Sequence, residues 1–367
     1  MIPVLYILVF LLILGLLSHT PYVTRKTELF GVSIPSRAAD HEQCRRLRAF
    51  YRGGMLLAGA GLAVAAALGF RLWGIGRAAG ALGFSAALGG CGLAGFLLYL
   101  ACRRRAKRLK DEMDWGAGAE AELLVVDTES PLGDTLSPAW LLLYLLIPVL
   151  TSIAIGLAWP FAADPLPLHY DALGRVDRTA PKTIAAVLSL LLGQALVLLV
   201  CAGAFFAVRH GKRQIDAADA EASRSRERRF RRIMSASVLF GGALLGAFLG
   251  GLQVLTLLGL SARLISALSL ALTLSIALGA ALLFALVGQG GSRLRAPAKV
   301  RPGAANRDDD RHWKLGCFYR NGEDPAVFVE KRFGLGYTLN WARPAAWIIL
   351  AALLLVITGT VLFIGSA

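Results

Sequence analysis

The chain has 367 residues, of which 56% are hydrophobic and 17% charged, and its mean hydropathy is +0.60. These values lie far from those of soluble globular proteins and exclude water as the main solvent of the chain. A formal net charge of +15 would favour a nucleic-acid partner in a soluble protein. Here most basic residues lie in alternate loops at the ends of apolar runs. The highly charged loop 212–232 has neither interleaved aromatic residues nor a folded reader, so we expect no nucleic-acid partner.

Eight apolar runs reach or nearly reach the roughly 20 residues that a helix needs to cross the hydrocarbon core. We therefore predict an all-α integral membrane helical bundle of about eight transmembrane helices with a small β-rich cytoplasmic segment. No run contains Lys, Arg, Asp, Glu or His, which argues against most pumps and intramembrane enzymes because proton transfer needs ionisable side chains. We expect no enzymatic activity, cofactor or bound metal. The runs are 2–18, 53–70, 78–102, 139–161, 184–208, 234–260, 264–289 and 345–364.

The basic residues are distributed unequally between alternate loops. Of the 39 Lys and Arg residues, 33 lie in the loops 18–52, 103–110, 209–232 and 293–343. The positive-inside rule places these loops in the cytoplasm. We therefore expect a multi-pass protein of the cell membrane with both termini outside.

The runs and loops divide the chain into four parts. Residues 1–137 form an N-terminal three-helix membrane region with basic loops, and 138–290 form a four-helix membrane region. Residues 291–343 form a cytoplasmic domain rich in aromatic and basic residues, and 344–367 form the last transmembrane helix. Five scattered cysteines without a C-x-x-C spacing indicate neither a disulfide framework nor a zinc site.

Two basic segments of the N-terminal region have simple expected structures. Residues 40–52 predict a short charged helix that leads into the second run. The arginine-rich segment 103–108 could attract anionic lipid head groups, but it is more typical of the solvated flank of a membrane span.

The outer loop 164–182 concentrates most of the ionisable groups that we expect outside. His169, Asp171 and Asp177 could converge on a cation or a cationic peptide. The same side chains could instead bond to backbone donors and hold a rigid turn, with Gly174 supplying a positive φ and Pro167 fixing the approach. The residue pattern favours the structural interpretation over ligand capture, and both remain open.

The loop motif resembles the signature loop of SdpI-like bacterial membrane proteins. Pro167, His169, Gly174 and Asp177 stand at the matching positions of its Leu-Pro-x-His and Gly-x-x-Asp pattern, and Lys182 matches the usual closing lysine. The resemblance covers about the fourth to sixth apolar runs. It implies a domain of unknown function that is shared by an immunity and signalling protein against a secreted toxin. The second, immunity-defining half of that protein is absent from this chain.

Two patterns in the later runs concern helix packing and transport. Gly242, Gly246 and Gly250 follow a four-residue spacing, which predicts a seam for close helix packing. Gln194, Gln253 and Gln289 could line a polar path, and they are the basis for the alternative function of a transporter or channel subunit.

The segment 309–341 resembles a small domain of unknown function that is often found at the end of such proteins. It predicts two or three short strands with a turn at Asn321-Gly322. Its aromatic rings have basic neighbours, so we expect them to face the cytoplasmic head groups. The acidic triplet 308–310 indicates a solvated turn more than a cation site. The residues that carry the resemblance include Asp310, Trp313, Phe318, Tyr319, Asp324, Arg332, Gly334, Gly336 and Trp341.

Together these patterns favour a non-enzymatic sensor, immunity or signalling component of the bacterial cell envelope. Membrane lipids are the expected partners, together with an extracellular peptide at the loop 164–182 or a cytoplasmic regulator. The oligomeric state is unreadable from the sequence.

Overall fold

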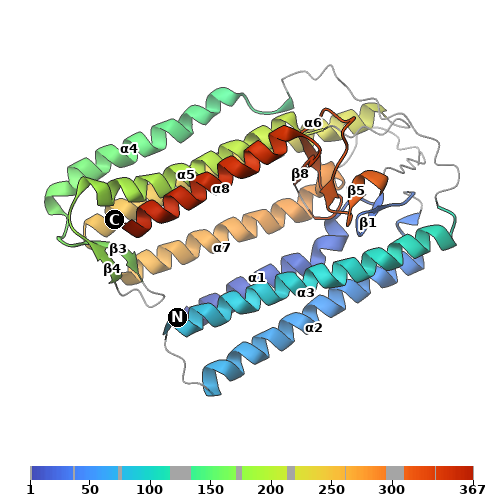
Figure 1. Ribbon diagram of the computed structural model, residues 1–367, viewed down its shortest axis with the longest axis horizontal. Helices are drawn as coiled ribbons and strands as arrows, with labels where there is room; N and C mark the ends of the chain where they lie inside the picture. Colours follow the sequence, from blue (N-terminus) through green and yellow to red (C-terminus); the bar gives the residue numbers. More distant parts are fainter. Residues whose placement is uncertain are drawn as a thin grey trace. The chain divides into compact units, whose positions relative to one another are not determined.

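The computed structural model describes residues 2–35, 38–72, 77–115, 134–170, 176–212, 220–260, 262–294, 310–334 and 336–366. This part of the chain is mainly α-helical (Figure 1). Its α-helices are α1 (Ile2–Val23), α2 (Glu42–Leu72), α3 (Arg77–Glu112), α4 (Leu142–Ala158), α5 (Ile184–His210), α6 (Ala220–Leu257), α7 (Ala262–Val287) and α8 (Pro344–Ser366).

Each helix contains most or all of one of the predicted apolar runs. Six of the helical segments are long and apolar enough to cross a membrane: those of α2, α3, α5, α6 and α7, and α4 together with its flanking 3₁₀ turns. The apolar stretches described in α1 and α8 are shorter, Ile7–Val23 and Pro344–Gly359. A helical membrane protein is thus supported for six spans, while the total of eight stays a prediction.

The strands form four separate antiparallel pairs. They are β1 (Glu28–Leu29) with β2 (Val32–Ser33), β3 (Leu166–Tyr170) with β4 (Val176–Ala180), β5 (Trp313–Lys314) with β6 (Phe318–Tyr319), and β7 (Phe328–Glu330) with β8 (Tyr337–Leu339). The apolar sequence at 123–128, whose pattern predicts a single short strand, lies outside the described residues.

The chain divides into two compact units. The first comprises 1–130, 212–230 and 277–342, and the second comprises 131–211, 231–276 and 343–367.

In the first unit, α2 and α3 form an antiparallel pair with closely approaching backbones (Figure 1). A Cβ added at Gly54 would lie 3.0 Å from Leu98, and one added at Gly90 would lie 3.0 Å from Leu62. The small residues of both helices therefore serve close packing. The charged segment 42–52 is the first part of α2 and continues into the apolar run as one helix.

The loop between α1 and α2 places apolar side chains in the core of this unit. Leu29, Phe30, Val32 and Ile34 are at most 2% exposed and join a cluster that includes Met55 of α2. Phe30 and Gly31 both have positive φ, 49° and 71°, as a tight turn between two short strands requires. This basic loop is therefore a folded part of the unit.

In the second unit, the predicted glycine seam of α6 packs against α4 and α5. A Cβ at Gly246 would lie 2.6 Å from Leu198 of α5, and one at Gly250 would lie 2.1 Å from Thr151 of α4. Gln194 of α5 is 1% exposed and donates to Thr151 Oγ1 at 3.0 Å and to the Gly246 carbonyl at 2.8 Å. The seam therefore fixes the register of three helices.

Arg231 at the base of α6 is almost fully buried in the second unit. Its guanidinium donates to the carbonyls of Val208 (3.0 Å), Arg209 (3.2 Å) and Gly211 (2.5 Å) at the end of α5. These carbonyls have no partner within the helix, so Arg231 satisfies them and its charge complements the helix dipole.

We expect Gly250→Ala to destabilise the protein by about 1–3 kcal/mol, because a methyl group there would collide with Thr151 and displace the Gln194 amide. Thermal unfolding in detergent, followed by circular dichroism, measures the effect. Gly251→Ala is the matched control, since a Cβ at Gly251 has nothing within 4 Å. Equal stability of the two variants would contradict the close packing of this seam.

Candidate functional site

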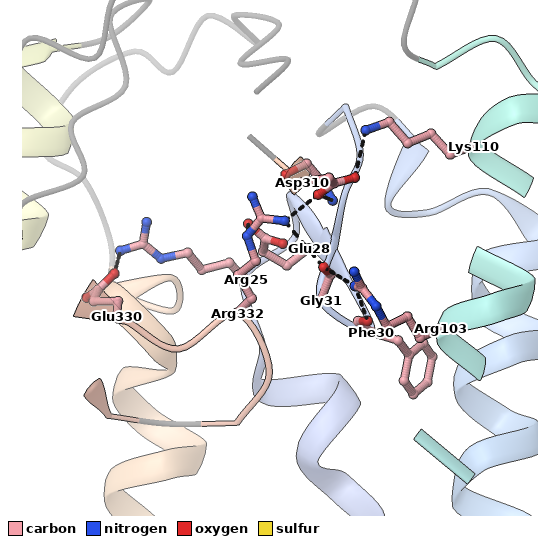
Figure 2. A network of polar contacts seen from close by, with 10 residues as sticks. Arg25, Glu28, Phe30, Gly31, Arg103, Lys110, Asp310, Glu330 and Arg332 are labelled. Atoms are coloured by element: carbon pink, nitrogen blue, oxygen red, sulfur yellow. Dashed lines mark hydrogen bonds and ion pairs between the residues drawn. The ribbon is translucent and has the colours of Figure 1, made fainter. Parts of the chain in front are cut away.

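Segments far apart in the sequence meet in a polar cluster of the first unit (Figure 2). They are the loop after α1, the C-terminal part of α3, and the segment 310–332. The members of this ion-pair cluster are Arg25, Glu28, Arg103, Lys110, Asp310, Glu330 and Arg332. The sequence pattern singled out none of them as site residues.

Asp310 is the central carboxylate of the cluster. One oxygen accepts from Arg332 and from the backbone N–H of Ser33 at 3.2 Å, and the other accepts from Lys110 Nζ at 3.0 Å. Burial by itself would raise the pKa of Asp310, but the charge of Arg332 and the hydrogen bond and charge of Lys110 outweigh it and lower the pKa. Asp310 therefore stays ionised and joins three segments.

Arg332 is 4% exposed and contacts several groups besides Asp310. Its Nε lies 3.7 Å from the carboxylate of Glu28, and its guanidinium carbon lies 4.9 Å from the ring centroid of Trp313. Arg332 also donates to the carbonyl of Gly31 at 3.3 Å. This side chain therefore anchors the tail to the β1–β2 turn.

Arg25 forms the second ion pair of the cluster, with Glu330. Burial by itself would lower the pKa of Arg25, but the carboxylates of Glu330, Glu227 and Glu28 outweigh it and raise the pKa. Glu227 belongs to the first turns of α6, so its charge links this helix to the cluster electrostatically.

Arg103 connects α3 to the β1–β2 turn. It is 7% exposed and donates to the carbonyls of Gly31 at 2.5 Å and Phe30 at 3.4 Å. The solvated flank predicted for 103–108 is therefore wrong for Arg103, because its side chain turns inward to the carbonyls of this turn. Arg104, Arg105, Lys107 and Arg108 are exposed as predicted.

Asn340 organises the loop between β6 and β7. It is fully buried, and its amide donates to the carbonyls of Asn321 (2.8 Å), Asp324 (3.1 Å) and Ala326 (3.1 Å). Its oxygen accepts from the backbone N–H of Asn321 at 3.0 Å and of Ala342 at 3.2 Å. The Asn321-Gly322 segment is thus a bend held by Asn340, while the hairpin turn of this region lies at 315–317.

Two further contacts tie this region to other segments of the first unit. Lys212 Nζ lies 2.6 Å from Asp324, which also accepts from the Tyr319 hydroxyl at 2.7 Å. Burial would raise the pKa of Asp324, but hydrogen bonds from Lys212, the Ala326 backbone and Tyr319 outweigh it and lower the pKa. Gln289, just after α7, accepts from the Gly336 N–H at 3.0 Å.

The aromatic residues of the tail mostly face inward. Trp313, Tyr319 and Val329 form a small buried core, and the Trp313 and Tyr319 rings lie 5.1 Å apart. Phe333 stacks 5.5 Å from Phe30. The prediction of a solvated turn at the acidic triplet 308–310 is wrong for Asp310, the one described residue of the three. Its carboxylate forms ion pairs with Lys110 and Arg332.

The loop 164–182 forms the β3–β4 hairpin in the second unit. Its backbone pairs Pro167 with Thr179 and His169 with Arg178, and Asp177 lies on β4 between paired positions. Asp171 and Gly174 lie outside the described residues, and the side chains of His169 and Asp177 do too. Convergence of these groups therefore stays a prediction.

The base of the hairpin is fixed to the helices. Leu166 and Ala180 are 1% and 3% exposed and pack with Ile155, Ala186 and Leu257. Beside them, Lys182 Nζ donates to the Ala162 carbonyl at 2.9 Å and lies 5.3 Å from the Trp159 ring centroid. The closing lysine of the motif is therefore a structural clamp.

The glutamines that suggested a polar path take part in packing. Gln253 donates to the Leu190 carbonyl at 2.9 Å, Gln194 bridges three helices, and Gln289 holds Gly336. Among the described residues, no group of three or more His, Cys, Asp or Glu side chains could hold a metal ion.

The fold is thus that of a helical protein with several membrane-length spans and a small domain built around short hairpins. Residues 323–347 match the model of a family of unknown function, DUF5808. The matched segment contains Glu330, Arg332 and Asn340, and it supports a domain of unknown function in this tail. The comparison with curated proteins finds no match, and neither does the comparison with solved structures.

We expect Asp310→Asn to destabilise the protein by about 3 kcal/mol at neutral pH, because Arg332 and Lys110 would lose their shared carboxylate. A pKa lowered by folding adds stability above the unfolded value of about 3.9, and this stability disappears as the pH falls through the folded pKa. Wild-type stability should therefore decrease below about pH 4, and the variant should lose part of this dependence.

Unfolding in detergent between neutral pH and pH about 3 tests both effects. Asp111→Asn is the matched control, since Asp111 is an exposed carboxylate on α3, next to Lys110. A variant that unfolds like this control at every pH would contradict the role of Asp310.

Proposed function

We propose that this chain is a non-enzymatic, SdpI-like component of the bacterial cell envelope that senses, or gives immunity to, an external membrane-active peptide. The observation that carries the proposal is the β3–β4 hairpin. Its buried base and the Lys182 clamp hold Pro167, His169 and Asp177 on a fixed backbone. Recognition residues commonly lie on loops that a rigid scaffold positions.

The chemistry of the hairpin motif favours a cationic ligand. Carboxylates at 171 and 177 and the imidazole of His169 offer acceptors to Lys or Arg side chains. A cationic peptide must pass the outer face before it reaches the lipid, so residues at the outer ends of the spans meet it first.

The proposed topology has both termini outside and the ion-pair cluster in the cytoplasm. The four loops that contain 33 of the 39 basic residues contribute directly bonded groups to the first unit. Examples are the pairs Arg25–Glu330, Lys110–Asp310 and Lys212–Asp324. Segments that bond to one another must lie on the same side of the membrane, which supports the alternation of the predicted spans.

In this proposal the ion-pair cluster and the domain at 310–342 lie in the cytoplasm and transmit the signal there. This domain contacts α3, Arg25 in the loop after α1 and Gln289 just after α7, so a shift of these helices would change its surface. A cytoplasmic regulator is the partner that would detect such a change.

We expect the cysteine introduced by Thr179→Cys to react with a membrane-impermeant maleimide from outside intact cells. The cysteines introduced by Arg228→Cys and Glu323→Cys should react only after the cells are opened. All three positions are exposed, so protein packing does not limit the reaction. The five native cysteines are free and are replaced by Ala or Ser first. Labelling at 323 from outside would overturn the orientation.

We expect His169→Ala with Asp177→Ala to abolish protection of expressing cells against a panel of cationic membrane-active peptides. Abundance in the membrane should be nearly unchanged, since in this proposal both side chains face the aqueous phase, where substitutions usually alter stability by no more than about 0.5 kcal/mol. Thr179→Ala, an exposed position on the same strand, is the control and should keep full protection.

Two outcomes contradict this role of the hairpin. Disappearance of the double variant from the membrane would make the two residues structural staples. Full protection by an abundant double variant, or no protection by the wild type, would remove the hairpin from recognition.

A further inference from the structure

The β5–β6 hairpin has two chemically different faces. Trp313 and Tyr319 are paired across the strands and buried, while the neighbouring pair, Lys314 and Phe318, is exposed. Phe318 is 45% exposed, and Leu315 at the tip is 51% exposed. Because side chains alternate along a strand, the inner face completes the core of the domain and the outer face has no packing role there.

The residue at the tip is unusual for a turn in water. Leu315 has a φ of 52°, in the left-handed region that favours Gly, Asn and Asp. A large apolar side chain is thus held in an unfavourable backbone conformation and left exposed. An exposed leucine at this position of a turn is expected where the surroundings of its side chain are themselves apolar.

Contacts with α3 show the depth at which the tip lies. The Leu315 carbonyl accepts from the Tyr99 hydroxyl at 3.0 Å. A Cβ added at Gly316 would lie 2.3 Å from Arg103 Nη1 and 2.5 Å from the Tyr99 hydroxyl, so the turn packs closely on this last part of the apolar run. Tyr99 precedes Arg103 by four residues, which corresponds to roughly 6 Å along the helix.

The direction of helical side chains adds to this argument. Cα–Cβ bonds tilt toward the N-terminus of a helix, and in α3 the apolar run lies on that side of Tyr99. The hydroxyl of Tyr99 therefore lies level with the apolar run and not beyond it. On the same turns of α3, Phe96 and Leu97 are 41% and 56% exposed, as residues that face lipid would be.

We propose that the β5–β6 hairpin is a lipid-inserting wedge, in which Leu315 and Phe318 enter the boundary between acyl chains and head groups. Its partner is the surface of the surrounding bilayer on the side of the basic loops. Lys314 and Arg320 are exposed next to the apolar pair, and Arg104 and Arg105 are exposed on the adjoining turn of α3. These charges complement anionic lipid phosphates, while the apolar tip suits the region just below them.

The wedge gives the small domain a second attachment, besides the ion-pair cluster. It rests on α3 being a membrane span and is independent of any role of the β3–β4 hairpin.

A nitroxide spin label tests the proposal in the full chain, reconstituted in nanodiscs that contain anionic lipid. The label is attached to p-acetylphenylalanine encoded at position 315 or 318, which leaves the native cysteines untouched. Leu97 provides the lipid-facing reference and Glu323 the aqueous reference. Collision rates with oxygen, which concentrates in lipid, and with a water-soluble nickel chelate are measured at each position.

We expect the ratio of oxygen to nickel collisions at 315 and 318 to exceed that at 323 several-fold and to approach that at 97. A ratio at both positions equal to that at 323 would place the tip in water and overturn the wedge. Slow collisions with both reagents would mean that protein covers the tip, which overturns it as well. Two labelled positions keep the test decisive if one substitution prevents folding.

Discussion

The first unit depends on the carboxylate of Asp310. It binds Arg332 of its own domain, Lys110 of α3 and the backbone of Ser33 in the loop after α1. These partners are separated by up to 300 positions in the sequence, so one side chain defines how three segments meet. An ion pair so deeply buried is expensive to break, since each partner would leave an uncompensated charge. The constraint therefore acts on specificity of assembly as much as on stability.

The same constraint explains how the first unit accommodates many basic residues. Repulsion among them would open a compact domain. Glu28, Asp310, Asp324 and Glu330 are each at least partly buried among the basic side chains and pair with them. Basic side chains of the first unit thus hold the domain at 310–342 to the neighbouring segments.

The helices were predictable because an apolar run of membrane length must satisfy its backbone hydrogen bonds within the segment, as a helix does. The ion-pair cluster was not, because nothing in the local sequence around Arg103 or Asp310 identifies partners 72 to 277 residues away. The tail was partly predictable: its domain of unknown function agrees with the pattern, but it has four short strands where two or three were predicted. A basic and aromatic composition suits both a lipid-facing surface and a core. Trp313 and Tyr319 belong to the core and Phe318 to the surface, and only the strand pairing separates them. The β3–β4 hairpin contains Pro167 in its first strand and has Pro165 and Pro181 immediately outside it, and these prolines hid its strands.

Basic side chains in this protein also complete the backbone of helices. Arg293 donates to the Ala285 carbonyl in the last turn of α7 at 2.7 Å and to the Tyr22 carbonyl in the last turn of α1 at 2.9 Å. Within the second unit, Arg231 does the same for α5. If the N-terminus is outside, odd-numbered helices end in the cytoplasm, so their unpaired carbonyls and negative dipole ends lie on the side where the positive-inside rule concentrates arginine. The charge asymmetry that orients the chain during insertion then supplies the caps that its cytoplasmic helix ends require.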